Sequence, residues 1–148
     1  LGAGRPGRAR RGARLMALHA LAGGLLLALL IAWQAEAIVR FFVPQATATL
    51  VAQGRTYFMI MVWAYPAAAL AVTLAAGING ARVVLPPLLI DLVLLGALFI
   101  PLVSLLATLL AGRFRLPHLW WTTVGIQWMI ACGYDLYFRR GGWLRRKA

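Results

Sequence analysis

The sequence contains three carboxylates, and one of them lies inside a long apolar run. Asp91 stands in the stretch PPLLIDLVLLG. A charge in hydrocarbon costs roughly 2.5–3.5 kcal/mol on insertion scales, so a carboxylate there needs a partner or a task. Asp91 therefore predicts a proton or cation site that faces the interior of a helix bundle. The alternative interpretation is an aspartate that stays hydrated near the headgroups or pairs with Arg82.

The other two carboxylates each stand four residues before an arginine. Glu36 precedes Arg40, and Asp135 precedes Arg139. Residues at this spacing are neighbours on the surface of a helix. The spacing predicts two ordinary surface ion pairs rather than transport residues.

Uncharged polar residues on the apolar runs are further candidates for an ion or substrate pathway. Tyr57, Asn79 and Gln127 join Asp91 in this candidate set. The alternative use is hydrogen bonding from helix to helix, which contributes about 0.6–2 kcal/mol per bond in membranes.

The sequence predicts neither a metal site nor a catalytic one. His19 and His118 have no second ligand three or four residues away, as a zinc site on a helix would need. No Walker loop, GxSxG, HExxH or CxxC motif is present. We therefore expect a protein that is not an enzyme and that carries no cofactor.

These residues are positioned by four apolar runs, which occupy most of the chain. Of the 148 residues, 63% are hydrophobic, and the charged fraction of 12% is about half that of soluble domains. About twenty residues of helix cross a bilayer core, and only helices satisfy the backbone there without a closed barrel. The sequence predicts an all-α polytopic membrane bundle, residues 15–138, with four transmembrane helices at about 15–39, 57–78, 83–110 and 119–138.

Proline and glycine predict where these helices bend, meet and stop. Pro66 and Pro101 lie inside the second and third runs and predict bends, and the pair Asn79-Gly80 predicts a turn. Gly23 and Gly24 are candidates for a close helix approach.

The charges are asymmetric about these runs. The net charge is +12, with a basic lead-in at 1–14 and a basic tail at 139–148. With four spans, eleven basic residues share the side of both termini and four lie on the other side. The positive-inside rule then predicts cytoplasmic termini, and the flanking positions favour lipid headgroups over nucleic acid. The richness in Ala, Leu and Arg suggests a bacterial source, hence a multi-pass protein of the bacterial inner membrane.

Four motifs, in order, resemble those of the multidrug and toxic compound extrusion family. They are LGAGRPGRARR at the start, Tyr57-Phe58-Met59-Ile60 with Pro66, GINGAR with Pro86, and YFRRGGW from Tyr137 to Trp143. The resemblance implies helices nine to twelve of a twelve-helix transporter that has two six-helix lobes. It also implies export of small cationic or amphipathic substrates by antiport with sodium or protons. The chain begins with Leu1, and we expect a C-terminal fragment whose partners are the lipid bilayer and the missing N-terminal lobe.

An alternative from a different class fits the same four runs. A self-contained four-helix membrane protein could act as an oligomeric small transporter or as a subunit of a membrane complex. It predicts a start codon close upstream and stable expression of these residues alone, whereas the first interpretation predicts about 300 further residues upstream with eight more spans, by the twelve-helix pattern.

Overall fold

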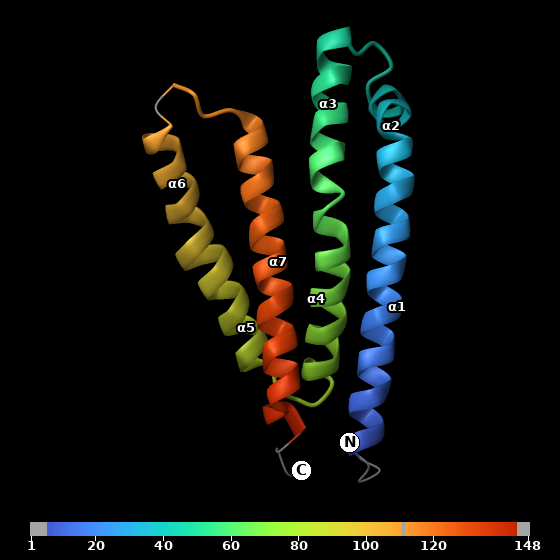
Figure 1. The fold of residues 1–148 in the computed structure, drawn as a ribbon, viewed down its shortest axis with the longest axis vertical. Helices are drawn as coiled ribbons and strands as arrows, with labels where there is room; N and C mark the ends of the chain where they lie inside the picture. Colours follow the sequence, from blue (N-terminus) through green and yellow to red (C-terminus); the bar gives the residue numbers. More distant parts are fainter. Residues whose placement is uncertain (1–5, 111, 145–148) are drawn as a thin grey trace.

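The computed structural model describes residues 6–110 and 112–144, and these form an elongated helical bundle (Figure 1). Two parts of the sequence predictions lie outside the described residues. They are Gly2 to Arg5 of the first motif and Arg145 to Lys147 of the basic tail. The elements are α1 (Pro6–Trp33), α2 (Ala35–Phe42), α3 (Ala48–Met61), α4 (Ala64–Asn79), α5 (Leu85–Asp91), the π-helix η1 (Leu92–Phe99), α6 (Ile100–Leu109), α7 (Leu116–Arg140) and the short 3-10 helix η2 (Gly142–Leu144).

The first helix starts earlier and ends earlier than the expected span 15–39. Residues 6–14 of the basic lead-in form the first turns of α1, which begins at Pro6. Proline suits the first helical position because its missing N–H has no partner there anyway, and Arg and Ala propagate a helix well. The helix stops at Trp33, where the uniformly apolar run gives way to a segment with one polar face.

That segment is α2, which runs across the end of α1 instead of continuing it (Figure 1). Pro44 follows its end at Phe42, and proline cannot continue a helix. The chain then enters α3, where the Thr47 hydroxyl caps the helix by accepting a hydrogen bond from the Leu50 N–H at 3.3 Å.

The second expected span, 57–78, is a broken pair of helices. The axes of α3 and α4 differ by 45°. Pro66 has no N–H for the carbonyl of Val62, four residues earlier, so the ladder fails at that point. The Trp128 indole of α7 donates to the Trp63 carbonyl at 3.0 Å and holds the break in place. The bend predicted from Pro66 is confirmed, and so is the turn after Asn79, where α4 ends.

The third expected span, 83–110, corresponds to one long helix with a π-helical middle. α5 has Pro86 and Pro87 in its first turn, where N–H groups are free. The π-helical stretch η1 ends at Phe99, so Pro101 falls in the first turn of α6. The hydrogen-bond pattern changes from π-helical to α-helical just before Pro101. The proline, which has no N–H, therefore stands where it disrupts no bond inside the helix.

The last helix closes with a compact cap that explains the YFRRGGW motif. Gly141 adopts φ 71°, a left-handed conformation that glycine reaches without strain. Trp143 then folds back: its indole donates to the Phe138 carbonyl at 3.0 Å, and its ring stacks on Phe138 with centroids 4.8 Å apart. The Arg10 guanidinium of α1 donates to the Arg139 carbonyl at 2.6 Å. The start of α1 and the end of α7 thus lie on the same side of the bundle.

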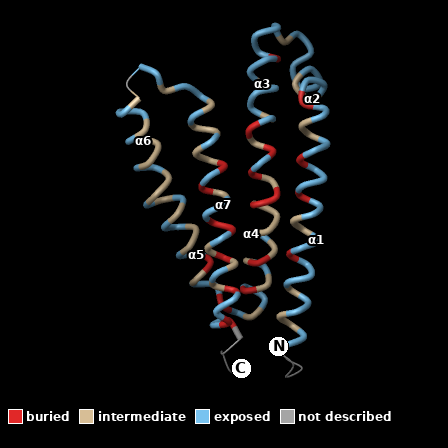
Figure 2. Tube along the Cα trace, viewed as in Figure 1, coloured by how far each residue is buried: buried red, intermediate tan, exposed pale blue. Residues whose placement is uncertain are grey.

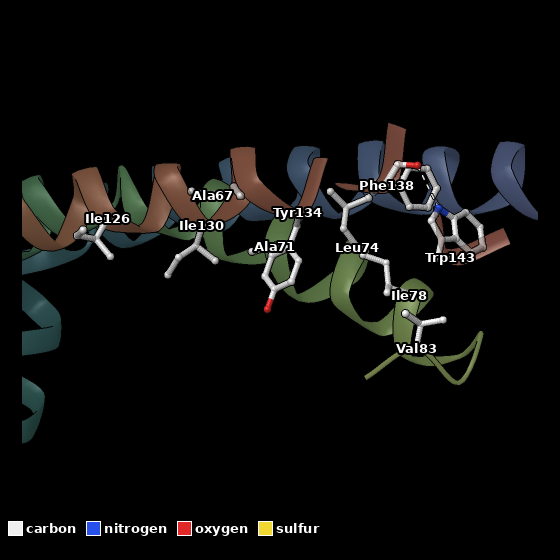
Figure 3. Close-up of a cluster of buried hydrophobic side chains, with 12 residues drawn as sticks. Ala67, Ala71, Leu74, Ile78, Val83, Ile126, Ile130, Tyr134, Phe138 and Trp143 are labelled. Atoms are coloured by element: carbon white, nitrogen blue, oxygen red, sulfur yellow. Dashed lines mark hydrogen bonds between the residues drawn. The ribbon is translucent and has the colours of Figure 1, made fainter. Parts of the chain in front are cut away.

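The core lies between α4 and α7, with α1 packed on the other side of α4 (Figures 1 and 2). Gly24 allows this approach, because a Cβ there would sit 3.0 Å from the Ala69 Cβ and 3.1 Å from the Pro66 Cα. Gly23 has open space around it. Figure 3 shows the buried side chains of the core, which include Ala67, Ala71, Leu74, Ile78, Ile126, Ile130, Tyr134 and Phe138.

Among the described residues, two helical stretches are long and apolar enough to cross a membrane, Gly7–Trp33 and Leu85–Leu109. The bent pair of α3 and α4 makes a third if it is one span. The 25-residue α7, expected to span at 119–138, is not among them, because Trp, Thr, Gln127 and Asp135 lower its hydropathy. The structure therefore supports a helical membrane protein with two or three of the four expected spans.

Candidate transport site

Three of the four predicted pathway residues line one cavity. Asp91 at the end of α5, Asn79 at the end of α4 and Gln127 in the middle of α7 surround a cavity of about 380 Å³. The rest of the wall is almost entirely apolar: Ala68, Ala71, Val72, Ala75, Ala76, Leu95, Ile130 and Tyr134. A mostly apolar hollow with a few convergent polar groups is the usual composition of a small-ligand site.

Tyr134 joins α7 to α5 beside Asp91. The Tyr134 hydroxyl of α7 donates to the Pro87 carbonyl of α5 at 3.3 Å, and Tyr134 lines the cavity together with Asp91. Tyr134 is 3% exposed, and Figure 3 shows its ring beside Ile130 and Ala71. The Asp91 side chain is half-buried and lines the cavity, so its carboxylate oxygens can accept hydrogen bonds or bind a cation there.

Tyr134 is the residue that the sequence analysis did not place in the site. The available signal was its spacing, because residues 127, 130 and 134 recur at helical intervals and lie on one face of α7. Gln127 and Tyr134 are therefore two turns apart on the face that looks at Asp91.

Asn79 and Gln127 supply neutral polar groups to the same cavity. Asn79 is exposed and Gln127 is half-buried. An amide offers one acceptor and two donors, so each can serve either a cation or a polar substrate group. The cavity thus combines one carboxylate, one phenol and two amides.

Tyr57 lies elsewhere. It is on α3, where its ring makes an edge contact with Trp120 of α7 at a centroid distance of 5.3 Å. It does not line the Asp91 cavity. Tyr57 shares the bundle with the other three candidates but not their site.

The other two carboxylates form the surface pairs that their spacing predicted. Glu36 bonds Arg40 at 3.0 Å, and Asp135 bonds Arg139 at 2.7 Å. Both pairs join residues four apart on one helix, and the predictions are confirmed.

The side chains of both histidines lie within hydrogen-bond distance of backbone groups. His19 has its Nδ1 2.7 Å from the Leu15 carbonyl, one turn earlier. His118 accepts a hydrogen bond from the Arg115 N–H at 3.0 Å and so satisfies a free donor at the start of α7. Within residues 6–110 and 112–144, no three His, Cys, Asp or Glu side chains gather closely enough to hold a metal ion.

A comparison with protein-family models matches residues 1–109 to the model described as MatE. The match covers most of the chain, including the helices that carry Asn79 and Asp91. The chain belongs to the MatE family. The family predicted from the four motifs is therefore confirmed, and its members are membrane transporters. No curated protein and no solved structure gives a significant match.

The MatE match ends before α7 begins, so Gln127 and Tyr134 lie outside the matched residues. The structure nevertheless brings α7 against α4 and α5. The cavity is therefore made partly by the matched region and partly by the helix that follows it.

Proposed function

We propose that this MatE chain is part of a secondary active exporter of small cationic or amphipathic compounds, driven by antiport of sodium or protons. The observation that carries the proposal is the family match over residues 1–109. Support comes from a half-buried carboxylate in an apolar cavity, since such groups in membranes commonly carry ions or protons.

The proposed mechanism is alternating access, in which the bundle rocks against a second lobe of the transporter. Asp91 binds the coupling cation or proton, and Asn79 and Gln127 orient the ion or the polar end of the substrate. The Tyr134 hydroxyl donates its hydrogen to the Pro87 carbonyl, so its oxygen can act as a further acceptor for a cation bound at Asp91. Loading Asp91 removes its net charge and so lowers the cost of keeping the site away from water.

We also propose that the protein is a multi-pass protein of the bacterial inner membrane with both termini in the cytoplasm. The end of the bundle where α1 starts and α7 ends carries Arg8, Arg10, Arg11, Arg14, Arg139 and Arg140. The opposite end carries Arg40, Arg55, Arg113 and Arg115. The more basic end belongs inside by the positive-inside rule.

Efflux from bacterial cells that lack their own exporters tests the proposal. Cells that express the full-length gene are loaded with a fluorescent organic cation, and its loss is followed with and without ionophores that collapse the sodium or proton gradient. We expect faster loss than in cells with an empty vector, and we expect one of the ionophores to abolish it. Loss at the empty-vector rate, or loss that neither ionophore affects, contradicts the proposal.

A further inference from the structure

A groove separate from the Asp91 cavity runs along α4 between α1 and α7. It has a volume of about 430 Å³. Leu70 and Leu74 of α4 form its floor, and α1 and α7, which both pack on α4, form its sides. The proposed transport site shares no lining residue with this groove.

The groove is polar at one end and apolar along the rest. Arg14, Asp135 and Arg139 line the end where α1 starts and α7 ends. Leu18 and Leu21 follow Arg14 at helical spacing on the same face of α1 and lead toward the middle of the bundle. Leu74 and Leu70 follow the same direction on α4. A single ligand bound along the groove would contact charged side chains at one end and apolar side chains along the rest.

The charged end favours an anion. The Asp135 carboxylate forms an ion pair with the Arg139 guanidinium at 2.7 Å. Arg14 therefore gives this end of the groove a net positive charge. Arg10, one turn before Arg14, bonds the Arg139 carbonyl and adds a second positive charge beside the groove. Leu18 is 61% exposed, which leaves the apolar part open from the side.

We infer that this groove binds an anionic phospholipid of the leaflet that borders the helix termini. The phosphate lies at Arg14, and the upper part of one acyl chain lies along Leu18, Leu21 and Leu70. Basic pockets between membrane helices on the cytoplasmic side recognise anionic headgroups in this way. A free anion would use the arginine but not the leucines. A zwitterionic lipid would use the leucines but would bind the arginine less strongly, because its own cation offsets the phosphate charge. The inference rests on the membrane placement of the bundle and not on transport.

Binding is measured on the purified full chain in a neutral detergent by native mass spectrometry, titrated with phosphatidylglycerol or phosphatidylcholine. We expect a lower apparent Kd for phosphatidylglycerol. Arg14→Gln should weaken phosphatidylglycerol binding about fivefold, because one arginine near an anionic headgroup contributes about that factor. Arg14→Gln should weaken phosphatidylcholine binding less, because the choline cation already offsets the charge of that lipid's phosphate.

The matched control is Arg8→Gln, which removes the same charge from an exposed residue of α1 outside the groove. Six residues separate positions 8 and 14, so they face different directions on the helix. Leu18→Trp keeps the charge and fills the apolar part, and we expect it to weaken binding of phosphatidylglycerol. The thermal unfolding midpoint of each variant, measured without added lipid, confirms that it is folded.

Equal affinity for the two lipids, or equal effects of Arg14→Gln and Arg8→Gln, would overturn the inference. Inorganic phosphate, added at the concentration of the lipid, is expected not to compete. Competition by phosphate would assign the arginine to a free anion and would also overturn it. Because no step requires transport, a protein that fails to export the organic cation can still pass or fail this test.

Discussion

Two regions of the bundle differ in how they are packed. We call α1, α4 and α7 the slab, and α5, η1 and α6 the arm. The slab helices pack on one another along much of their length, whereas the arm meets the slab through α5 and η1 and diverges from α7 beyond them (Figure 1). No described residue of η1 or α6 is buried (Figure 2).

The difference follows from the side chains that each region offers. The slab meets through small residues such as Gly24, Ala67, Ala71 and Ala131, which let the backbones approach closely. The arm is rich in leucine and valine. Lipid tails are as apolar as leucine, so burying leucine against protein gains little inside a membrane, whereas close backbone packing gains dispersion energy. The Asp91 cavity lies where the two regions join.

The largest expected contrast is between leucines of the two regions. Leu74 of the slab is 2% exposed, and Leu105 of the arm is 53% exposed. Leu74→Ala should lower the free energy of unfolding in detergent by about 2–5 kcal/mol, because it leaves a cavity. Leu105→Ala should change it by less than about 0.5 kcal/mol. Denaturant titration followed by circular dichroism measures both, and equal losses would end the distinction between slab and arm.

A second contrast tests whether close approach holds the slab together. Gly24→Leu would force α1 away from the α4 backbone near Pro66. We expect a loss of about 1–3 kcal/mol, typical of overpacking. Gly23→Leu is the matched control, because a Cβ at Gly23 meets nothing within 4 Å. The same titration applies, and a tolerated Gly24→Leu would show that the two helices do not depend on this contact.

The smallest effect concerns the joint between the two regions. Tyr134→Phe removes the hydroxyl that bonds the Pro87 carbonyl and faces Asp91. The loss should be about 1 kcal/mol, the usual contribution of one hydrogen bond. Tyr57→Phe serves as the control, since Tyr57 contacts Trp120 through its ring. If both variants unfold at the same denaturant concentration, the Tyr134 hydroxyl does not join the arm to the slab.

Local features of the structure were predictable from the sequence. The pair Glu36–Arg40 and the end of α4 at Asn79 depend on residues close in sequence. The break near Pro66 arises because proline has no N–H to bond the carbonyl of the residue four positions earlier. In each case the physics operates within one or two turns, so an isolated segment contains the information.

Features that depend on which faces meet were not predictable. The sequence grouped Tyr57 with Asp91, but α3 and the break after it carry Tyr57 to another part of the bundle, beside Trp120. It did not include Tyr134, which shares a face of α7 with Gln127 and lines the cavity. The hydropathy of the first apolar run also did not predict that α1 ends at Trp33, because hydropathy contains no information on the direction of a helix.

Ion-driven uptake of an organic cation into proteoliposomes that contain the protein tests the proposed role of Asp91 most directly. Asp91→Asn is compared with Glu36→Gln, which removes a carboxylate from an exposed surface pair. We expect that Asp91→Asn abolishes the dependence of uptake on the sodium or proton gradient, while Glu36→Gln retains it. Gradient-driven uptake of the same size in both variants would contradict the assignment of the coupling site to the Asp91 cavity.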